Sequence, residues 1–463
     1  MKNALLIFAF LSFYLSSVHA SVEIRSNKLT TGDGLANNSI RYMFQDSKGF
    51  MWMGTVNGLS YYDGNSFVSI YPDPNLPISL ADPRIRNMEE DSNGFLWIAT
   101  LSSLYSCYDL KHGRFVDFTG CGEYKQSYSK KIIASDQSIW LWDNNNGCRR
   151  VVYQDGQFSS QAYKKELGNL SSDKVLFVYE SNDSPGHVWI GTKQGLWKYH
   201  DGKLEAMDTQ GESWEHIFSY DQYTCIITGK KEIYRHSLSN NRLEKIASLT
   251  ELGDTGVITG SLRLQHQWVM FTATGSYILD PVTGKLRRFS RLNIKNGNVT
   301  RDNKGNAWVH NYTGNVWYVN TSTGDIKHFQ FLSSEHLGYI DVERYSIIHD
   351  SRDIIWITTY GNGLFAYDLN TGDLQHFTFE VSHSSHINSN YLQYIIEDRS
   401  GGIWVSSEFS GLSHLEILNK GTLRIYPNGE DASDRSNTIR MLLRGKNGNV
   451  YMANRMGTLY EYD

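Results

Sequence analysis

Short runs of alternating hydrophobic and polar residues, separated by glycine-containing turns, repeat along the chain. In the first copy these runs are residues 40–45, 51–55, 59–62 and 66–71. Asn57-Gly58 and Asp63-Gly64 stand between runs, and such dipeptides are strong signals of tight β-hairpin turns. The pattern therefore predicts units of four antiparallel strands.

The units share the motif Asp-x-x-Gly-x-x-Trp, complete in some copies and partial in others, with the turn before the second strand and Trp within it. The clearest copies are Asp46-x-x-Gly49-x-x-Trp52, Asp91-x-x-Gly94-x-x-Trp97, Asp302-x-x-Gly305-x-x-Trp308 and Asp398-x-x-Gly401-x-x-Trp404. Weaker copies keep Trp140, Trp189, Trp268 and Trp356, and two more keep the pattern around Ile226 and Tyr451. Successive anchors lie 37 to 49 residues apart, a period typical of β-propeller blades. We expect the repeated Trp to pack between neighbouring blades.

The number of units predicts how the blades divide into rings. Ten anchors exceed a single ring of roughly four to eight blades, so we expect an all-β protein with one seven-bladed β-propeller followed by an incomplete second one. The predicted boundaries are 1–20 for a signal peptide, 21–331 for the first propeller and 332–463 for three further blades. An early strand at 22–29 is expected to close the first ring by pairing with its last inner strands. Because three blades cannot close a ring, we expect a longer parent protein.

The first twenty residues have the pattern of a secretory signal peptide. Lys2 supplies the positive charge, residues 4–18 form an apolar run, and Val18-His19-Ala20 offers a small-residue cleavage site. An uncleaved membrane anchor is the alternative, although the run is short for a bilayer span. We therefore expect export to the periplasm.

The composition and charge of the chain disfavour several classes of function. The formal net charge of −5 is spread along the chain without a long basic tract, which disfavours binding to nucleic acids. The 40 glycines and abundant aromatic residues suit an all-β protein with many turns. The four cysteines have no zinc-site or redox-motif spacing. Cys107 and Cys121 could form a disulfide between neighbouring strands or remain unpaired thiols.

A longer signature adds a family resemblance. Residues 34–41 read Gly-Leu-Ala-Asn-Asn-Ser-Ile-Arg, and residues 46–63 add Trp-Met-Gly-Thr-x-Asn-Gly-Leu-x-x-Tyr-Asp after the Asp-x-x-Gly turn. Together they closely resemble the two-component regulator propeller repeat, which builds the periplasmic sensor part of hybrid two-component systems of Bacteroides-type bacteria. The resemblance extends over the mature chain and is strongest around Trp52, Trp97, Trp356 and Trp404.

The resemblance implies a function. Family members have two seven-bladed propellers, a membrane helix and a histidine kinase, and they sense oligosaccharides released from polysaccharides. It therefore implies an oligosaccharide ligand, a homodimer in the full-length protein, and membrane attachment only through a segment missing here. This chain has no kinase motifs, so kinase activity is implied only for a longer parent.

Catalytic and metal-binding motifs are absent from the sequence. There is no Gly-x-Ser-x-Gly elbow, no His-Glu-x-x-His and no phosphate loop. We interpret His383 and His386 as part of a polar loop. Residues 368–373 faintly resemble a calcium loop but lack its distal Glu, so we interpret them as a blade hairpin. We expect no catalytic residues, no cofactor and no metal.

Polar and aromatic residues in the loops of one propeller face are the candidate ligand contacts. Amides bond sugar hydroxyls, and aromatic rings stack against sugar C–H groups. The candidates are Asn57, Asn144, Asn311, Tyr312, Tyr360, Asn362 and Glu408, and the same set of loops also contains Asn37, Asn38, Asn145 and Lys193. Asn57 and Asn362 precede Gly, so their role could instead be turn conformation.

These features predict a periplasmic ligand-sensing region of a hybrid two-component regulator without catalysis of its own. Two alternatives stay open. The motif also resembles the structural Asp-boxes of sialidases, so a secreted propeller glycosidase or polysaccharide lyase is the first. A scaffold for protein interactions is the second.

Overall fold

A computed structural model describes residues 22–119, 127–182, 184–208, 213–229, 232–254, 257–302, 304–311, 315–330, 346–380, 387–418, 438–446 and 449–462. The predicted signal peptide, Cys121, Tyr312, His383 and His386 lie outside these residues. The chain divides into two compact units, residues 1–417 and 418–463.

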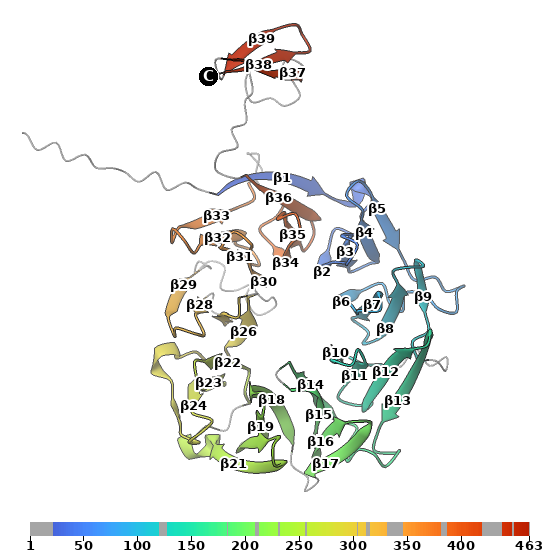
Figure 1. Ribbon diagram of the computed structural model, residues 1–463, viewed down its shortest axis with the longest axis vertical. Helices are drawn as coiled ribbons and strands as arrows, with labels where there is room; N and C mark the ends of the chain where they lie inside the picture. Colours follow the sequence, from blue (N-terminus) through green and yellow to red (C-terminus); the bar gives the residue numbers. More distant parts are fainter. Residues whose placement is uncertain are drawn as a thin grey trace, which may run out of the picture. The chain divides into compact units, whose positions relative to one another are not determined.

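The protein is an all-β propeller, as the sequence predicted, and the described residues of the first unit form nine four-stranded sheets (Figure 1). We number them blades 1 to 9 in chain order. Blades 1 to 5 are β2–β5 (Ile40–Gln45, Met51–Thr55, Leu59–Tyr62, Phe67–Ile70), β6–β9 (Ile85–Glu90, Phe95–Thr100, Tyr105–Asp109, Arg114–Val116), β10–β13 (Lys130–Ile133, Ile139–Trp142, Cys148–Gln154, Gln157–Tyr163), β14–β17 (Val175–Ser181, Ser184–Thr192, Gly195–His200, Lys203–Asp208) and β18–β21 (Trp214–Asp221, Thr224–Gly229, Glu232–Ser237, Arg242–Ser248).

Blades 6 to 8 are β22–β25 (Gly260–Leu264, Gln267–Phe271, Ser276–Leu279, Leu286–Arg288), β26–β29 (Asn298–Arg301, Ala307–His310, Asn315–Val319, Ile326–Gln330) and β30–β33 (Ser346–His349, Ile354–Thr358, Leu364–Asp368, Leu374–Phe377). Blade 9 combines β34–β36 (Leu392–Glu397, Ile403–Ser407, Leu412–Leu418) with β1 (Glu23–Leu29). Short 3-10 helices are η1 (Thr31–Asp33), η2 (Leu249–Leu252) and η3 (Ser290–Leu292).

Blade 1 shows how the repeat builds a sheet. Asp46 follows the inner strand β2, and its Oδ1 accepts hydrogen bonds from the backbone N–H groups of Lys48 (3.0 Å) and Phe50 (2.9 Å). The other carboxylate oxygen accepts a 2.8 Å bond from the indole Nε1 of Trp52, which is buried on β3. Gly49 completes the turn with a φ of 95°, a conformation that glycine adopts without strain. The motif therefore holds a turn and a buried indole with one side chain.

The blades pack against one another around a ring (Figure 1). Nine apolar clusters of the described residues each join two neighbouring blades, and one of them joins blade 9 to blade 1. That closing cluster includes Met43 and Met51 of blade 1 with Trp404 and Leu412 of blade 9. Each sheet is thereby covered on both faces, which a single blade could not achieve alone.

Polar contacts at equivalent positions also link the blades. Glu90, the last residue of β6, accepts hydrogen bonds from both the N–H and the hydroxyl of Ser47 in blade 1, each 2.6 Å long. At the closing junction the equivalent acceptor is Gln45, the last residue of β2, which accepts a 2.9 Å bond from the Arg399 N–H of blade 9. The Arg399 guanidinium also donates to the carbonyl oxygen of Ser47 (2.9 Å). The closing junction therefore uses the same type of contact as an internal one.

The predicted division at residues 331/332 requires correction. The strand predicted at 22–29 does close a ring, but β1 pairs with β36 of the ninth blade rather than with the blade that contains Trp308. The first compact unit consequently holds nine blades instead of seven, and it extends to residue 417 instead of 331. The reason is physical: every blade presents a similar third-strand edge, so the local pattern does not specify which edge β1 completes.

The second unit contains one three-stranded antiparallel sheet, β37–β39 (Ile439–Arg444, Val450–Asn454, Leu459–Tyr462). Several of its apolar side chains are exposed, among them Leu442 at 66% and Leu459 at 63%. Neighbouring residues on a strand point to opposite faces, so the exposure of both Leu442 and Leu443 leaves both faces of this sheet uncovered.

Three further expectations concern individual segments. Cys107, Cys148 and Cys225 are buried free thiols. Residues 368–373 form the turn between β32 and β33, in which the Asp368 carboxylate accepts from the Asn370 N–H (2.8 Å). Within the described parts of the chain, no helix is long and apolar enough to cross a membrane, and no group of three His, Cys, Asp or Glu side chains is arranged to hold a metal ion.

Candidate ligand-binding site

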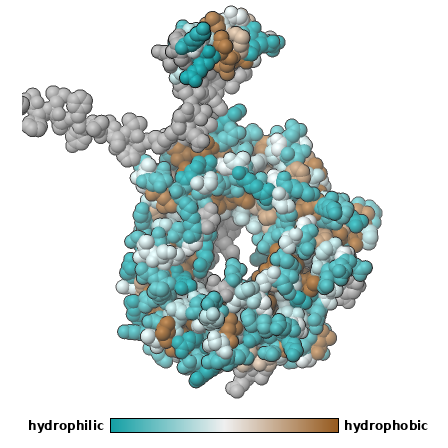
Figure 2. Space-filling view, viewed as in Figure 1, coloured by the Kyte–Doolittle hydropathy of each residue, from teal (hydrophilic) through white to brown (hydrophobic). Residues whose placement is uncertain are grey.

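The described candidate residues all lie in loops between the second and third strands of their blades. Asn57 is in blade 1, Asn144 in blade 3, Asn311 in blade 7, Tyr360 and Asn362 in blade 8, and Glu408 in blade 9. Because the blades repeat one orientation around the ring, these loops share one face of it. They are spread over five of the nine blades. The described surface is largely hydrophilic, and the ring has an axial opening (Figure 2).

Glu408 and Tyr360 make contacts that join blades. Glu408 is 8% exposed, and its carboxylate forms a 3.0 Å ion pair with Arg41 of blade 1 and accepts a hydrogen bond from Gln393 of blade 9. The ring of Tyr360 meets that of Tyr391 edge-on, with centroids 5.2 Å apart. These residues therefore stabilise the junctions on either side of blade 9.

The asparagine candidates differ in their surroundings. Asn57 is exposed, and its N–H donates to the Thr55 hydroxyl (3.1 Å) within the turn. The N–H of Asn311 donates across its turn to the Asn315 carbonyl (3.4 Å). Among the predicted candidates, Asn144 lines a substantial pocket.

This pocket has a volume of about 480 Å³ and spans blades 3, 4 and 5. We call it the axial pocket because the inner strands β10, β14 and β18 contribute much of its lining. It is lined by Lys130, Trp142, Asn144, Leu176, Phe177, Val178, Tyr179, Lys193, Glu215, His216, Ile217, Phe218 and Val257. Lys193 belongs to the loop set singled out in the sequence. The size suits a small-molecule or oligosaccharide site.

Two β-bulges shape the inner wall of the axial pocket. The pairing of β14 with β15 shifts register between Val175 and Phe177, and that of β18 with β19 shifts between Trp214 and His216. Leu176 and Glu215 are the extra residues, and both line the pocket. The same shift occurs between the first two strands of blades 1, 2 and 9, so the bulge belongs to the repeat and does not mark the pocket by itself.

Two buried nitrogen atoms of the lining have no hydrogen-bond partner within the described part of the chain. They are the indole Nε1 of Trp142, whose residue is 5% exposed, and the Nε2 of His216. Burial lowers the pKa of His216, and Lys130 lowers it further, while a hydrogen bond with the Ile258 backbone opposes both. His216 is therefore a neutral imidazole at neutral pH. Both nitrogen atoms are closed off from solvent, so they are unpaired polar groups of the packing behind the pocket rather than contacts open to a ligand.

The lining combines several kinds of contact. Trp142, Phe177, Tyr179 and Phe218 supply aromatic rings, Asn144 an amide, and Lys130 and Lys193 positive charges. Planar amides and aromatic faces are the groups that a sugar requires. The pocket holds no arrangement that we identify as catalytic.

One position of the repeat changes beside this pocket. The position two residues after the anchor Trp is small in several blades, as at Gly54, where an added Cβ would lie 2.5 Å from Ile85 of the next blade. In blade 3 that position is occupied by Trp142. Trp142 packs in the apolar cluster between blades 3 and 4 and forms part of the wall of the axial pocket.

Comparisons with known proteins bear on the repeat and on the fold. The family model "Two component regulator propeller" matches residues 34–57 and 79–102. A search of curated proteins gave no match.

Solved structures with similar architecture were also found. The extracellular domain of the putative hybrid two component system BT4673 from B. thetaiotaomicron is 16% identical, with 95% of this chain and 58% of that chain covered and a TM-score of 0.39. The corresponding domain of BT3049 from the same organism is 18% identical, with coverage of 95% and 72% and a TM-score of 0.31. The Dos1 propeller is 10% identical, with coverage of 84% and 94% and a TM-score of 0.49. This chain thus spans 58% of the BT4673 domain.

The family-model matches cover the inner strand, the Asp-x-x-Gly-x-x-Trp turn and the second strand of blades 1 and 2. These are the same segments whose hydrogen bonds define the blade. The chain is a β-propeller protein that carries two-component regulator propeller repeats.

Proposed function

We propose that this chain is the ligand-sensing region of a hybrid two-component regulator and that it binds an oligosaccharide in the axial pocket. The observation that carries the proposal is the lining of that pocket, which combines aromatic rings with the exposed side chains of Asn144 and Lys193. The regulator propeller repeat supports a sensory role rather than a catalytic one.

The proposal extends to location and assembly. Residues 1–20 direct export, so the region works in the periplasm. In a full-length parent, a homodimer of this region would pass the signal through a membrane segment to a histidine kinase. A ligand shifts the equilibrium between two arrangements of a dimer only if it binds one arrangement more tightly than the other. The axial pocket is formed by three blades, so its shape changes if these blades move relative to one another.

Isothermal titration calorimetry of the purified chain with a panel of neutral and acidic oligosaccharides tests the proposal. We expect saturable binding of one class of oligosaccharide. Replacing Phe218, a half-buried ring of the lining, with Ala removes a stacking surface and should weaken binding about tenfold. Asn144→Ala gives a second, more exposed variant of the same pocket.

The matched control is Asn57→Ala, which changes an equivalent loop outside the pocket. It should leave affinity unchanged. Absence of binding by every oligosaccharide would refute the proposal. Turnover of one of them would instead support the alternative of a secreted glycosidase or lyase.

A further inference from the structure

A second cavity lies between blades 6 and 7, among the turns that join first to second and third to fourth strands. Its volume is about 500 Å³, and it is lined by Arg263, Gln265, His266, Arg301, Thr321 and Ser322. In antiparallel blades these turns lie on the face opposite the loops that contain Asn144 and Lys193. We call this cavity the arginine pocket, and it is separate from the axial pocket.

The positive charge of the arginine pocket is not neutralised by its lining. None of the six lining residues is acidic. Neither Arg263 nor Arg301 forms an ion pair within the described residues, and the Arg301 side chain has no hydrogen bond there. Two guanidinium groups beside each other repel, so an anion between them would be favourable.

Arg263 is held in place before any ligand binds. Its Nε donates to the Gln265 carbonyl oxygen (3.0 Å), and its Nη1 donates to the Tyr220 carbonyl oxygen (2.8 Å). The guanidinium carbon also lies 5.3 Å from the centroid of the Tyr220 ring. These contacts fix the plane of the guanidinium and leave Nη2 available. A fixed donor loses less conformational entropy on binding than a free one.

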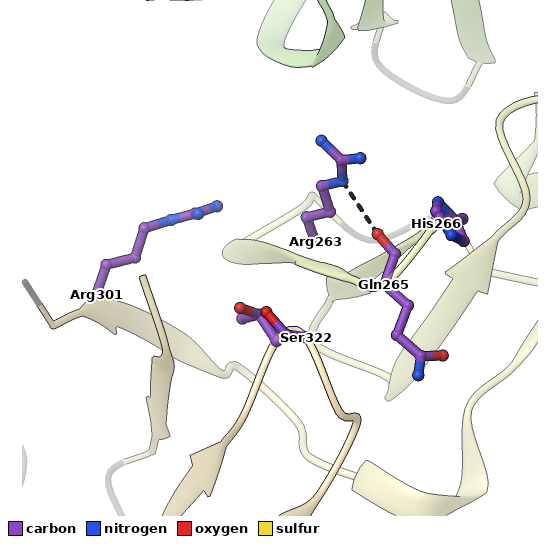
Figure 3. A pocket seen from close by; sticks show the side chains of 6 residues that line it. Arg263, Gln265, His266, Arg301 and Ser322 are labelled. Atoms are coloured by element: carbon purple, nitrogen blue, oxygen red, sulfur yellow. Dashed lines mark hydrogen bonds between the residues drawn. The ribbon is translucent and has the colours of Figure 1, made fainter. Parts of the chain in front are cut away.

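Six side chains line the cavity, and Figure 3 shows how they lie. Arg263 and Arg301 extend toward it from neighbouring blades, and Ser322 lies below and between them. The Gln265 side chain turns away, and its Nε2 donates to the Thr323 carbonyl (3.2 Å), which supports the turn that carries Ser322. The arrangement offers guanidinium and hydroxyl donors from three chain segments.

We propose that the arginine pocket is a binding site for a tetrahedral oxyanion, sulfate or phosphate, either free or as an ester group on a larger ligand. Guanidinium groups match the oxygen spacing of such anions and form strong charge-assisted hydrogen bonds with them. Arg263 and Arg301 supply the charge, and Ser322 supplies a neutral donor. The site lies on a different face from the axial pocket and does not depend on the function proposed above.

Calorimetric titration of the purified chain with inorganic sulfate and with inorganic phosphate tests this proposal at constant ionic strength. We expect saturable binding of one anion per chain. Arg301→Gln removes a charge without breaking a described contact and should weaken binding about tenfold. Arg263→Lys retains the charge but loses the planar fork, so it should also weaken binding.

The matched control is Arg287→Gln on β25, an exposed arginine of blade 6 outside the cavity. It makes the same change in net charge and should leave anion affinity unchanged. The axial-pocket variant Phe218→Ala should likewise have no effect. The proposal is overturned if neither anion binds saturably, or if Arg301→Gln and Arg287→Gln behave alike.

A further arm distinguishes a free anion from an ester. A sulfated oligosaccharide is compared with inorganic sulfate and with its desulfated counterpart. Tighter binding of the sulfated sugar than of inorganic sulfate, lost on desulfation and weakened by Arg301→Gln, supports the site and assigns the anion to a glycan. Binding of inorganic anions alone supports the site as one for free anions.

Discussion

The indole nitrogen of the repeated tryptophan has different surroundings in two groups of blades of the same ring. In the Asp-anchored blades, which contain Trp52, Trp97, Trp308, Trp356 and Trp404, a carboxylate six residues earlier accepts a hydrogen bond from the indole Nε1. In the unanchored blades, which contain Trp140 and Trp268, the indole nitrogen is buried with no partner in the described part of the chain. The fold is the same, but the polar group inside it is satisfied only in the first group.

The sequence explains the difference. Ala134 occupies the Asp position of blade 3, although the turn keeps the same backbone bonds, from Ala134 N to Ser138 O (2.9 Å) and from Gln137 N to Ala134 O (2.9 Å). Gln137 takes the glycine position with a φ of 63°. In blade 6 the turn is shortened to Gln265-His266, and no carboxylate is present. Packing alone is therefore enough to keep the Trp buried, while the Asp adds a polar anchor.

Among the substitutions that test this comparison, Asp91→Ala should have the largest effect on the free energy of unfolding. The change leaves three donors without their acceptor, the Trp97 indole and the backbone N–H groups of Asn93 and Phe95. We expect a loss of about 3 kcal/mol in the free energy of unfolding, measured by chemical denaturation. Asp136→Ala, in the more exposed turn of blade 3, is the control and should cost less. Equal costs would show that the anchor contributes nothing special.

Replacing the indole itself should separate the two groups of blades. Trp97→Phe removes packing and also leaves the buried Asp91 carboxylate without its indole donor, so we expect a loss of about 2 kcal/mol. Trp140→Phe removes an unpaired nitrogen together with part of the ring, so its cost should be about 1 kcal/mol or less. The same denaturation measurement compares them. A larger cost for Trp140→Phe would reverse our interpretation.

Installing the missing anchor should stabilise an unanchored blade. Ala134→Asp places a carboxylate in a turn that already has the required backbone geometry, and we expect a gain of about 1 kcal/mol at neutral pH. In the Trp140→Phe background the gain should shrink because the indole donor is gone. A double-mutant cycle measures this coupling. A gain that is independent of Trp140 would mean that the carboxylate acts only on the turn.

Acid should weaken the anchors, and Asp398 offers the clearest case. Burial alone would raise the pKa of Asp398, but the His414 ring 3.5 Å away and hydrogen bonds from Ser400, the Trp404 indole and the Gly402 N–H outweigh burial and hold the pKa well below its usual value. The resulting stabilisation is fully present above about pH 4 and is lost as the pH falls toward the folded-state pKa. We expect about 1 kcal/mol of this contribution to be lost by pH 3.

The measurement is the free energy of unfolding at pH 7 and at pH 3 for the natural chain and for Asp398→Asn. The variant should be less stable at pH 7 and should lose less stability on acidification. Parallel pH dependence of the two proteins would contradict the assignment to Asp398.

The local structure could be predicted closely from the sequence. Strands were expected at 40–45, 51–55, 59–62 and 66–71, and the structure places β2 to β5 at Ile40–Gln45, Met51–Thr55, Leu59–Tyr62 and Phe67–Ile70. Alternation and turn residues act over a few positions, so they specify each hairpin without help from the rest of the chain.

The candidate site was predicted only in part. Asn144 and Lys193 were found because they lie in loops of the expected face, and both line the axial pocket. Tyr179 and Phe218 were not found, because their importance depends on their place on two inner strands and on the packing that brings those strands together. This packing does not follow from residue spacing. Glu408 looked available for a ligand, but it forms an ion pair with Arg41, a residue far away in the sequence.

The sequence by itself determined the blade: four strands, the turn held by Asp46 or its equivalents, and a tryptophan buried against the next sheet. Only the tertiary structure decided how many blades share a ring. Closure depends on which third-strand edge β1 completes, and on contacts such as Arg399 with Gln45 that join residues 354 positions apart. Because each repeat offers a similar edge and similar contacts, the choice is made by the packing of all nine blades together rather than by any local pattern.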